Sequence, residues 1–455
     1  MQFGNLTAIS PIDGRYSAKT SELQPLFSEY GLIHQRVLVE IRWLQALAAN
    51  PDISEVPPLA KAAQEQLEQM IAQFSMADAQ RVKAIESKTN HDVKAVEYFL
   101  KEKLAAHKAL ASLCEFVHFA CTSEDINNLA YALILKNARE QCVLPQLDQL
   151  IVLLKQYAHD QAKTPMLAHT HGQAAVPTTL GKEIANFVAR LQRQRQQIAA
   201  VQLMAKINGA VGNFNVHYCV YPEVDWRGHC QKFVEDLGLT HNAYTTQIEP
   251  HDSIVELCHA MIRCNHILVD YARDVWGYIS LNYFSQRIVA DEVGSSTMPH
   301  KVNPIDFEQA EGNLLIACSL FNHLANELPT SRWQRDLTDS TLLRNLGVAF
   351  AHSHLAWQAL QKGTKKLQAN RELMLQALDK HWDVLTEAVQ TMMRRYGVAN
   401  AYEQLKTLAR GQSIDQSALH HFIDGLDLPE HAKKQLKQLQ PKQYLGVSAT
   451  LADEI

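Results

Sequence analysis

The sequence has little glycine and lacks the alternating apolar runs that mark β-strands. Glycine supplies 18 of 455 residues, about 4% against about 7% in an average protein. Leu, Ala, Gln and Lys, which favour helices, are abundant. These features predict a mainly helical protein. The length is enough for about three domains.

Blocks of one charge and apolar runs of membrane length are also missing, and the formal net charge is −5. Their absence argues against a nucleic-acid-binding arm and a membrane-spanning segment. The first ten residues lack the basic and apolar regions of a secretory signal. The 8 cysteines form no C-x-x-C pair. We therefore expect buried thiols and a soluble, cytoplasmic protein that binds neither nucleic acid nor membrane.

Two long apolar stripes run through the middle of the chain at alternating spacings of three and four residues. They lie within residues 178–206 and 251–286, and Asn265 falls inside the second. Such stripes are typical of near-parallel helices in a bundle. Helices of roughly 40 residues exceed ordinary globular lengths and favour a bundle shared between subunits. We expect an all-α fold of three mostly helical domains: residues 1–111, a central long-helix bundle over 112–364, and residues 365–455.

The stretch from Gly294 to Pro304 is predicted to be a polar loop between two long helices. Gly294 frees the backbone, while Pro299 and Pro304 exclude helix. The stretch carries two adjacent hydroxyls, an imidazole, an ammonium and a carboxamide. A restricted polar loop on a rigid scaffold is a typical place for catalysis. On composition alone, a connector rich in turn residues explains the stretch equally well.

Two stretches combine helix-start signals with groups that suit an anion. His91 precedes an amphipathic helix, with Asn90 or Asp92 as the expected N-cap. Thr122-Ser123 precedes a longer helix. Hydroxyls beside the free N–H groups of a helix start can bind a carboxylate or a phosphate. Simple capping would explain the same residues.

A third stretch places two arginines and a hydroxyl around another helix start. Ser340 and Arg344 share one face of the predicted helix, and Arg335 lies just upstream. This arrangement predicts a phosphate cradle. Ion pairs with Asp336 and Asp339 are the competing explanation.

Two smaller features lie in helix breaks. His169 and His171 precede Pro177, which we expect to start the next helix. No cysteine or acidic residue lies near these histidines at ligand spacing, so a single histidine acting as an acid fits better than a metal site. Gln247, ahead of a later helix, could hydrogen-bond a base or a carboxylate, or cap the helix.

The pattern Gly-Ser-Ser-x-Met-Pro-x-Lys-x-Asn-Pro at residues 294–304 resembles the signature loop of the fumarase/aspartase superfamily, whose members expel fumarate by β-elimination. Thr122-Ser123 and Thr170-His171-Gly172-Gln173 resemble its other two signature regions, in the same order. Four features resemble the adenylosuccinate lyases in their longer bacterial form: Arg15-Tyr16, Asn90-His91-Asp92, the Thr-Ser-Glu-Asp form of the first region, and Trp333-Gln334-Arg335-Asp336 with Ser340 and Arg344. The resemblance covers the whole chain. Val302 and Gln309 stand where many members have Arg and Asn.

The resemblance implies elimination of fumarate from adenylosuccinate, giving AMP, and from the ribosyl carboxamide SAICAR, giving AICAR. It implies no metal and no other cofactor, and a homotetramer whose sites combine residues from three subunits. It assigns His171 as general acid and Ser295 as base, and it leaves open whether His91 shares the acid role. The implied substrate-binding residues are Arg15, Tyr16, Asn90, His91, Asp92, Thr122, Ser123, Gln247, Ser296, Lys301, Val302, Asn303, Arg335, Ser340 and Arg344.

Two other readings stay open at this point. One is a sister enzyme, such as argininosuccinate lyase or a carboxymuconate cycloisomerase, whose substrate carries no phosphate for Arg335 and Arg344. The other is a non-catalytic protein on the same scaffold, against which the presence of both Ser295 and His171 weighs.

Overall fold

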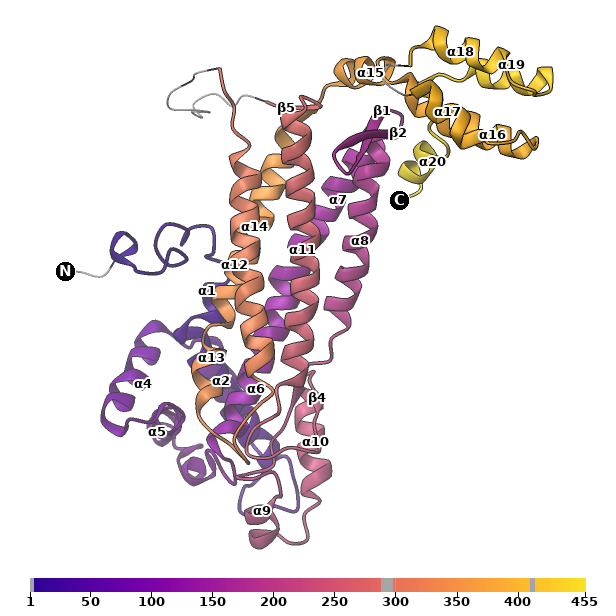
Figure 1. Ribbon diagram of the computed structural model, residues 1–455. Coiled ribbons are helices and arrows are strands. Elements are labelled where there is room, and N and C mark those ends of the chain that lie inside the picture. The colour runs from indigo at the N-terminus through magenta and orange to yellow at the C-terminus, as the bar shows by residue number, and fades with distance from the viewer. Residues whose placement is uncertain (1–3, 288–297, 299, 410–413) are drawn as a thin grey trace. The chain divides into compact units, whose positions relative to one another are not determined.

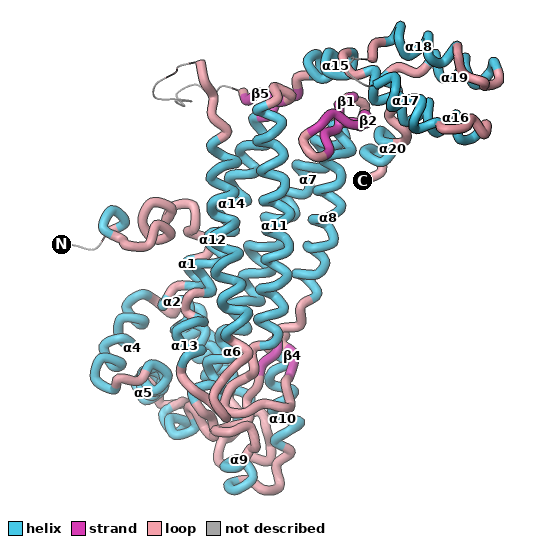
Figure 2. The backbone as a smooth tube through the Cα atoms, in the orientation of Figure 1, coloured by secondary structure: helices cyan, strands magenta, loops and turns pink. Residues whose placement is uncertain are grey.

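The computed structural model describes residues 4–287, 298, 300–409 and 414–455. Helices dominate the described residues, and strands occur there only as three short pairs (Figure 2). The predicted mainly helical fold is thus confirmed. Ser295 and Ser296 lie outside the described residues.

The elements follow one another in chain order. The first part of the chain forms η1 (Asn5–Thr7), α1 (Gln24–Phe27), α2 (Glu29–Ala48), α3 (Lys61–Ala72), α4 (Met76–Thr89), α5 (Asp92–Ala105), η2 (Ala111–Phe116), α6 (Ser123–Ala138), η3 (Arg139–Val143), α7 (Leu144–Asp160), β1 (Pro165–Thr170), β2 (Gln173–Thr179) and α8 (Leu180–Ala200). The middle forms β3 (Met204–Ala205), α9 (Asn215–Val220), α10 (Trp226–Asp236), β4 (Thr240–His241), α11 (Asp252–Ser280), β5 (Phe284–Gln286), α12 (Ile305–Glu327), α13 (Thr338–Leu343) and α14 (Leu346–Lys366). The last part forms β6 (Leu367–Ala369), α15 (Arg371–Asp379), η4 (Trp382–Leu385), α16 (Thr386–Arg395), α17 (Ala401–Ala409), α18 (Gln416–Asp424), α19 (Glu430–Gln438), η5 (Pro441–Gln443) and α20 (Ser448–Asp453).

The chain divides into two compact units. Unit 1 comprises Met1–Leu147, Gln194–His266 and Gly312–Ala356, and unit 2 comprises Asp148–Arg193, Ile267–Glu311 and Trp357–Ile455. The division falls inside the long helices α7, α8, α11, α12 and α14, which are labelled in Figure 1, so each of them contributes residues to both units. The three-domain division inferred from the sequence stays a prediction.

Local signals set the helix starts in unit 1. Ser28 caps α2 by accepting a hydrogen bond from the Gly31 N–H at 3.2 Å. The N-cap of α5 is His91, whose Nδ1 accepts from the Lys94 N–H at 3.1 Å. The prediction of Asn90 or Asp92 as this cap was wrong. Asn90 instead ends α4 in the left-handed conformation, with φ of 51°, which asparagine tolerates better than most residues.

The predicted apolar stripe of α8 is buried. Its members are 3% exposed or less: Leu180, Ile184, Phe187, Leu191, Ile198 and Val201. Asn265, inside the stripe of α11, is fully buried and donates to the Ser353 hydroxyl at 2.8 Å. The helix expected over residues 126–161 is α6 and α7 joined by the π-helical turn η3. Pro145 follows this turn. Proline has no N–H to donate within a helix, and the wider turn accommodates the missing hydrogen bond.

Residues 165–179 of unit 2 form a β-hairpin that the sequence analysis missed. Strand β1 pairs with β2 in antiparallel fashion as far as Thr170 and Gln173, which leaves His171 and Gly172 as the turn. Both turn residues have positive φ, 53° and 74°, as two-residue hairpin turns of type I′ require. Pro177 lies in β2 next to a register shift and does not start α8 as predicted. Bulged or edge positions tolerate proline because no ladder hydrogen bond is needed there.

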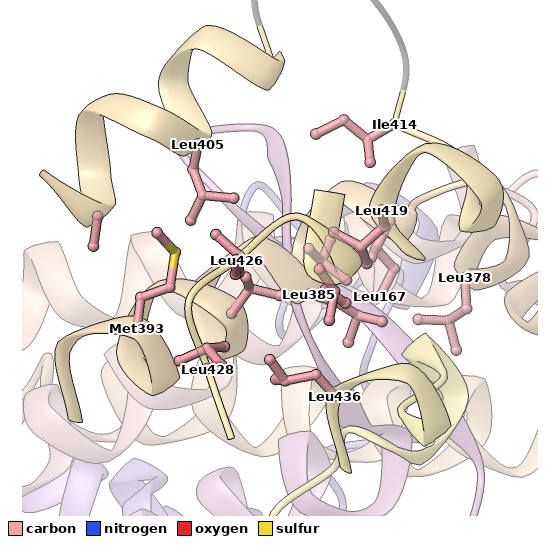
Figure 3. Close-up of a cluster of buried hydrophobic side chains, with 14 residues drawn as sticks. Leu167, Leu378, Leu385, Met393, Leu405, Ile414, Leu419, Leu426, Leu428 and Leu436 are labelled. Atoms are coloured by element: carbon pink, nitrogen blue, oxygen red, sulfur yellow. The ribbon is translucent and has the colours of Figure 1, made fainter. Parts of the chain in front are cut away.

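Unit 2 has a hydrophobic core of its own near the C-terminus. Leu167 of β1 packs there with leucines of the C-terminal helices, among them Leu385, Leu419 and Leu436 (Figure 3). Leu167 is 2% exposed. The base of the hairpin is therefore held by the core, while its turn is exposed.

The described residues bear on two further expectations, the lack of a membrane-spanning segment and the burial of the cysteines. No helix among them combines the length and the apolar character that crossing a membrane requires. All eight cysteines are free, but not all are buried as expected, since Cys219 is exposed and Cys114 and Cys121 are half-buried.

Candidate active site

Unit 1 brings several of the predicted binding residues into one cluster of charges. Arg344 donates from Nη1 to the carbonyl of Ser340 at 2.9 Å and to its hydroxyl. Its Nη2 lies 3.1 Å from Asp92 Oδ2. The same carboxylate oxygen lies 2.7 Å from Nη2 of Arg36, a residue of α2 that the sequence analysis did not single out. Ser340 and Arg344 thus lie on one side of α13, with Arg344 at its C-cap, as their spacing predicts; the phosphate cradle itself stays a prediction.

Asp92 is held as a carboxylate by these two guanidiniums. Burial alone raises its pKa, but the charge of Arg36, the Val93 N–H and the charge of Arg344 together lower the pKa below its usual value. Asp92 is thus ionised at neutral pH. Arg36 is 2% exposed at its side chain and Arg344 is 40% exposed. Of the two guanidiniums, only that of Arg344 can meet a ligand.

Arg335 forms the second branch of this cluster. Its Nη2 lies 3.2 Å from Glu124 Oε2 and 3.9 Å from Asp339 Oδ1, and its Nη1 donates to Gln247 Oε1 at 3.3 Å. The ion pair with Asp339, which was the competing explanation for Arg335 in the sequence analysis, is therefore present in the structure. Burial raises the pKa of Glu124, and the Arg335 charge works against that rise.

Asn127 connects the two branches. Arg36 Nε donates to Asn127 Oδ1 at 2.8 Å, and Asn127 Nδ2 donates to Glu124 Oε2 at 3.4 Å. A continuous polar path therefore runs from Arg344 to Arg335 through buried or half-buried groups. We call the path and its ion-pair partner Asp339 the arginine cluster, whose members are Arg36, Asp92, Glu124, Asn127, Arg335, Asp339 and Arg344.

His251 adds a buried imidazole beside this cluster. It is 1% exposed, and its Nε2 lies 3.5 Å from Asp339 Oδ2. Burial alone lowers its pKa, but Asp339 and the nearby Glu124 and Glu249 carboxylates raise the pKa above its usual value. Sequence analysis did not select this histidine, because Asp339 and Glu124 lie far away from it along the chain, although Glu249 is only two residues away.

The starts of α5 and α6 meet at His91 and Ser123. The Ser123 hydroxyl lies 3.4 Å from His91 Nε2. Because His91 Nδ1 accepts from the Lys94 N–H, the neutral imidazole carries its proton on Nε2, on the side of Ser123. The His91 side chain is 49% exposed. A hydroxyl and an imidazole N–H at the starts of two helices form an arrangement that suits an anion.

The segment that leads into Thr122-Ser123 has a strained backbone. His118 and Ala120 both have positive φ, 59° and 60°, which costs non-glycine residues about 1–2 kcal/mol each. Glu40 of α2 offsets this strain. Its carboxylate accepts from the His118 N–H at 3.0 Å and lies 2.6 Å from the His118 Nδ1.

Asp125, in the first turn of α6, fixes the glycine-rich turn at residues 206–212. Its carboxylate accepts from the N–H groups of Asn208 and Gly209 at 3.0 and 3.1 Å and pairs with the fully buried Lys206 at 2.8 Å. Gly212 has φ of 83°, and a Cβ there would lie 2.5 Å from the Thr245 carbonyl oxygen, so only glycine fits. The turn is a structural support and holds no nucleotide motif.

Arg15 and Tyr16 lie in the irregular segment before α1. The Arg15 guanidinium lies 5.9 Å from the centre of the Tyr16 ring. No hydrogen bond or ion pair among the described residues joins either of them to the arginine cluster. A pocket of about 330 Å³ is lined by the neighbouring Asp13 and Thr20 and by Arg344.

Unit 2 carries the remaining predicted residues. His171 is exposed at the hairpin turn. Lys301 is exposed, and its backbone N–H donates to the Met298 carbonyl at 3.0 Å. The Val302 carbonyl accepts from Gln286 Nε2 at 3.1 Å, and Asn303 is half-buried. Glu308 accepts from the Trp276 indole at 3.2 Å.

Arg36 and Glu40 are the principal supporting residues that the sequence analysis missed. Both are charged, and both lie among buried apolar residues of α2 such as Ile33, Val37 and Leu44. A charge within a buried stripe needs a partner, and this was the available signal. The described residues contain no group of three His, Cys, Asp or Glu side chains that could hold a metal ion.

Comparison with known proteins defines the class first. Residues 14–318 match the sequence family described as Lyase, and residues 331–445 match the one described as Adenylosuccinate lyase C-terminal. The fold is similar to that of a fumarate lyase from Mesorhizobium sp. BNC1, with a TM-score of 0.77 and 17% identity over 95% of this chain and 97% of that one. The fold and the matches define a lyase of the fumarase/aspartase superfamily.

Full-length relatives narrow the class. The adenylosuccinate lyase of Escherichia coli (strain K12) is 54% identical over 455 residues, covering 100% of both chains. That of Legionella pneumophila (strain Corby) is 55% identical over 446 residues, covering 98% of each. The chain belongs to the adenylosuccinate lyase family.

Proposed function

We propose that the protein eliminates fumarate from adenylosuccinate, giving AMP, and from SAICAR, giving AICAR. The observation that carries the proposal is the match over the full length to adenylosuccinate lyases at 54% identity. The arginine cluster supports it. Both substrates carry a phosphate and two carboxylates, and a protein with a net charge of −5 needs locally gathered cations to bind them.

Arg344, with Ser340, is the proposed phosphate contact. Its guanidinium is exposed on one side and fixed on the other by Asp92 and Ser340. A fixed guanidinium loses little rotational freedom when it binds a phosphate. Arg335 and Gln247, joined to each other, and His91 with Ser123 supply further donors for the base and the carboxylates.

His171 and Ser295 are the proposed acid and base. Ser295 removes the Cβ proton, and the carbanion delocalises into the neighbouring carboxylate. Lys301 and Asn303 stabilise the charge that develops there. His171 protonates the departing nitrogen, and its exposed position allows a substrate to reach it. A serine hydroxyl is a weak base, so water must be excluded when it acts.

The quaternary proposal is a homotetramer in the cytoplasm, with sites built from residues of three subunits. It can be tested by mixing Ser295→Ala with His171→Ala protein. Exchange of subunits should restore part of the activity, because some sites then receive an intact serine and an intact histidine. No recovery after verified exchange would contradict shared sites.

The reaction itself is tested by adding the purified protein to adenylosuccinate in the presence of a chelator. Fumarate should appear together with AMP in equal amounts. If a folded protein releases no fumarate from adenylosuccinate or from SAICAR, the proposal fails. Release from argininosuccinate alone would assign the protein to the sister activity.

A further inference from the structure

Helix α2 presents a row of buried polar anchors on one face. Arg36, Glu40 and Trp43 are 1% exposed or less and follow one another at spacings of four and three residues. Trp43 donates from its indole to the Phe119 carbonyl at 2.9 Å, and Glu40 holds His118. Arg36 is the member of this row that reaches Asp92.

We infer that Arg36 neutralises Asp92 so that the positive charge of Arg344 stays available to the substrate's phosphate. Arg36 is then a positioning residue for binding, because it acts through Asp92 and Arg344 and does not touch the substrate. The inference rests on the proposed function, which puts the phosphate at Arg344.

The charges of the three side chains support this role. Two guanidiniums share one carboxylate, so the group carries one net positive charge, and its most exposed part is the Arg344 side chain, at 40% against 25% for Asp92 and 2% for Arg36. Without Arg36, the Asp92 carboxylate would cancel the charge of Arg344. The distances agree, because Asp92 Oδ2 lies closer to Arg36, at 2.7 Å, than to Arg344, at 3.1 Å.

Packing alone does not explain an arginine at this position. Burying an ion pair carries a desolvation penalty that often equals or exceeds its attraction, and an apolar residue of similar volume fills the same space without it. Arg36 also uses Nε to hold Asn127 at 2.8 Å, which in turn contacts Glu124 of the Arg335 branch. One buried side chain therefore contacts Asp92, the partner of Arg344, and Asn127, which contacts the Glu124 partner of Arg335.

The test compares binding of AMP with binding of adenosine, which lacks the phosphate, by titration calorimetry on the full-length protein. Arg36→Met keeps the volume and removes the charge. We expect its Kd for AMP to rise about tenfold or more, as for the loss of a charge-assisted hydrogen bond. Its Kd for adenosine should stay unchanged, and KM for adenylosuccinate should rise more than kcat falls.

Arg139→Met is the matched control. Arg139 is another largely buried arginine of unit 1, 11% exposed at its side chain, which donates to the Val201 carbonyl outside the arginine cluster. Its replacement removes a buried charge without touching Asp92. We expect an unchanged Kd for AMP. A loss equal to that of Arg36→Met would overturn the inference, because any buried arginine would then serve.

A second replacement separates charge from structure. Adding Asp92→Asn to Arg36→Met removes the uncompensated carboxylate and should restore most of the AMP affinity, which a purely structural defect would not allow. A folded double variant without recovery would overturn the inference. If Arg36→Met does not fold, Arg36→Lys retains the charge and should bind AMP nearly as wild type does. A loss in Arg36→Lys as large as in Arg344→Ala would contradict the charge argument.

The outcomes also separate this inference from the proposed function. A wild-type protein that neither binds AMP nor releases fumarate would overturn the proposed function, and the phosphate role of Arg344 with it. A wild-type protein that does both, while Arg36→Met binds AMP equally well, would overturn only the role of Arg36.

Discussion

The arginine cluster of unit 1 and the hairpin turn of unit 2 present functional side chains in opposite ways. In unit 1, Arg335 is tied to Glu124 and Asp339, whose side chains are 2% and 9% exposed, and Arg344 is tied to Asp92, which is 25% exposed. In unit 2, His171 is exposed at a two-residue turn. Binding groups are thus fixed before a ligand arrives, whereas the imidazole of His171, the proposed acid, has no side-chain hydrogen bond or ion pair with any residue that the structure describes. Substitutions in the arginine cluster should therefore lower both substrate affinity and stability, whereas substitution of His171 at the turn should lower turnover alone.

The largest effect is expected at the turn. His171→Ala should lower kcat about 10²- to 10⁴-fold, the usual contribution of a general acid, and should leave the thermal midpoint unchanged because the side chain is exposed. Fumarate release at saturating substrate measures the first and a melting curve the second. His169→Ala is the matched control, exposed in the same hairpin, and should retain most of the activity. Equal losses in both variants would remove the special role of His171.

The next effect is expected at the exposed end of the arginine cluster. Arg344→Ala should raise KM for adenylosuccinate roughly 10- to 150-fold, as expected for losing a hydrogen bond to a charged group, with a smaller change in kcat. Initial rates over a range of substrate concentrations give both constants. Arg332→Ala, at a guanidinium that is 82% exposed and paired with Asp336, is the control. An unchanged KM for Arg344→Ala would contradict the phosphate contact.

A smaller effect should appear as a pH dependence of stability. The carboxylates around His251 raise its pKa in the folded protein. The stability from its imidazolium is therefore fully present below the unfolded-state value of about 6.5 and is lost as pH rises through the folded-state value. The gap in urea midpoint between wild type and His251→Gln should be widest below pH ~6.5 and shrink as pH rises. A gap that widens with pH would reverse the assignment.

The smallest effect is expected for an ion pair outside the cluster. Arg81 pairs with Glu102 in unit 1, and the two side chains are 51% and 47% exposed. Solvent screens such pairs, so Arg81→Ala should leave the urea midpoint and KM within error of wild type. A clear loss would show that exposed and buried pairs of unit 1 contribute alike, which would weaken the comparison drawn above.

The sequence predicted what depends on periodicity and on local motifs. Alternating spacings of three and four identified the buried faces of α8 and α11, and the i, i+4 spacing of Ser340 and Arg344 placed the two on one side of a helix. Sequence analysis failed where a short secondary-structure element is stabilised by residues that are distant in the chain. The hairpin of β1 and β2 is too short to show alternation clearly, and its base is held by Leu167 in a core made of residues from the C-terminal helices.

The supporting charges could not be predicted for a related reason. Arg36 and Asp92 are 56 residues apart, and Asp92 and Arg344 are 252 apart. No local sequence signal indicates that these three residues contact one another. The cap of α5 shows the same limit on a small scale, since Asn90, His91 and Asp92 all suit a cap, and the actual cap is the residue that propensity favours least.

The separation between Asp92 and Arg344 has a consequence for synthesis on the ribosome. At about 5–20 residues per second, the 252 residues between them take roughly 12 to 50 s to translate. Arg36 is made before Asp92, and Asn127 is made early in that interval. The Asp92 carboxylate can therefore be neutralised by Arg36 within the nascent N-terminal segment. Arg344 is the last member of the arginine cluster to be synthesised. A partly synthesised chain therefore carries the pair of Arg36 and Asp92 without the exposed guanidinium of Arg344.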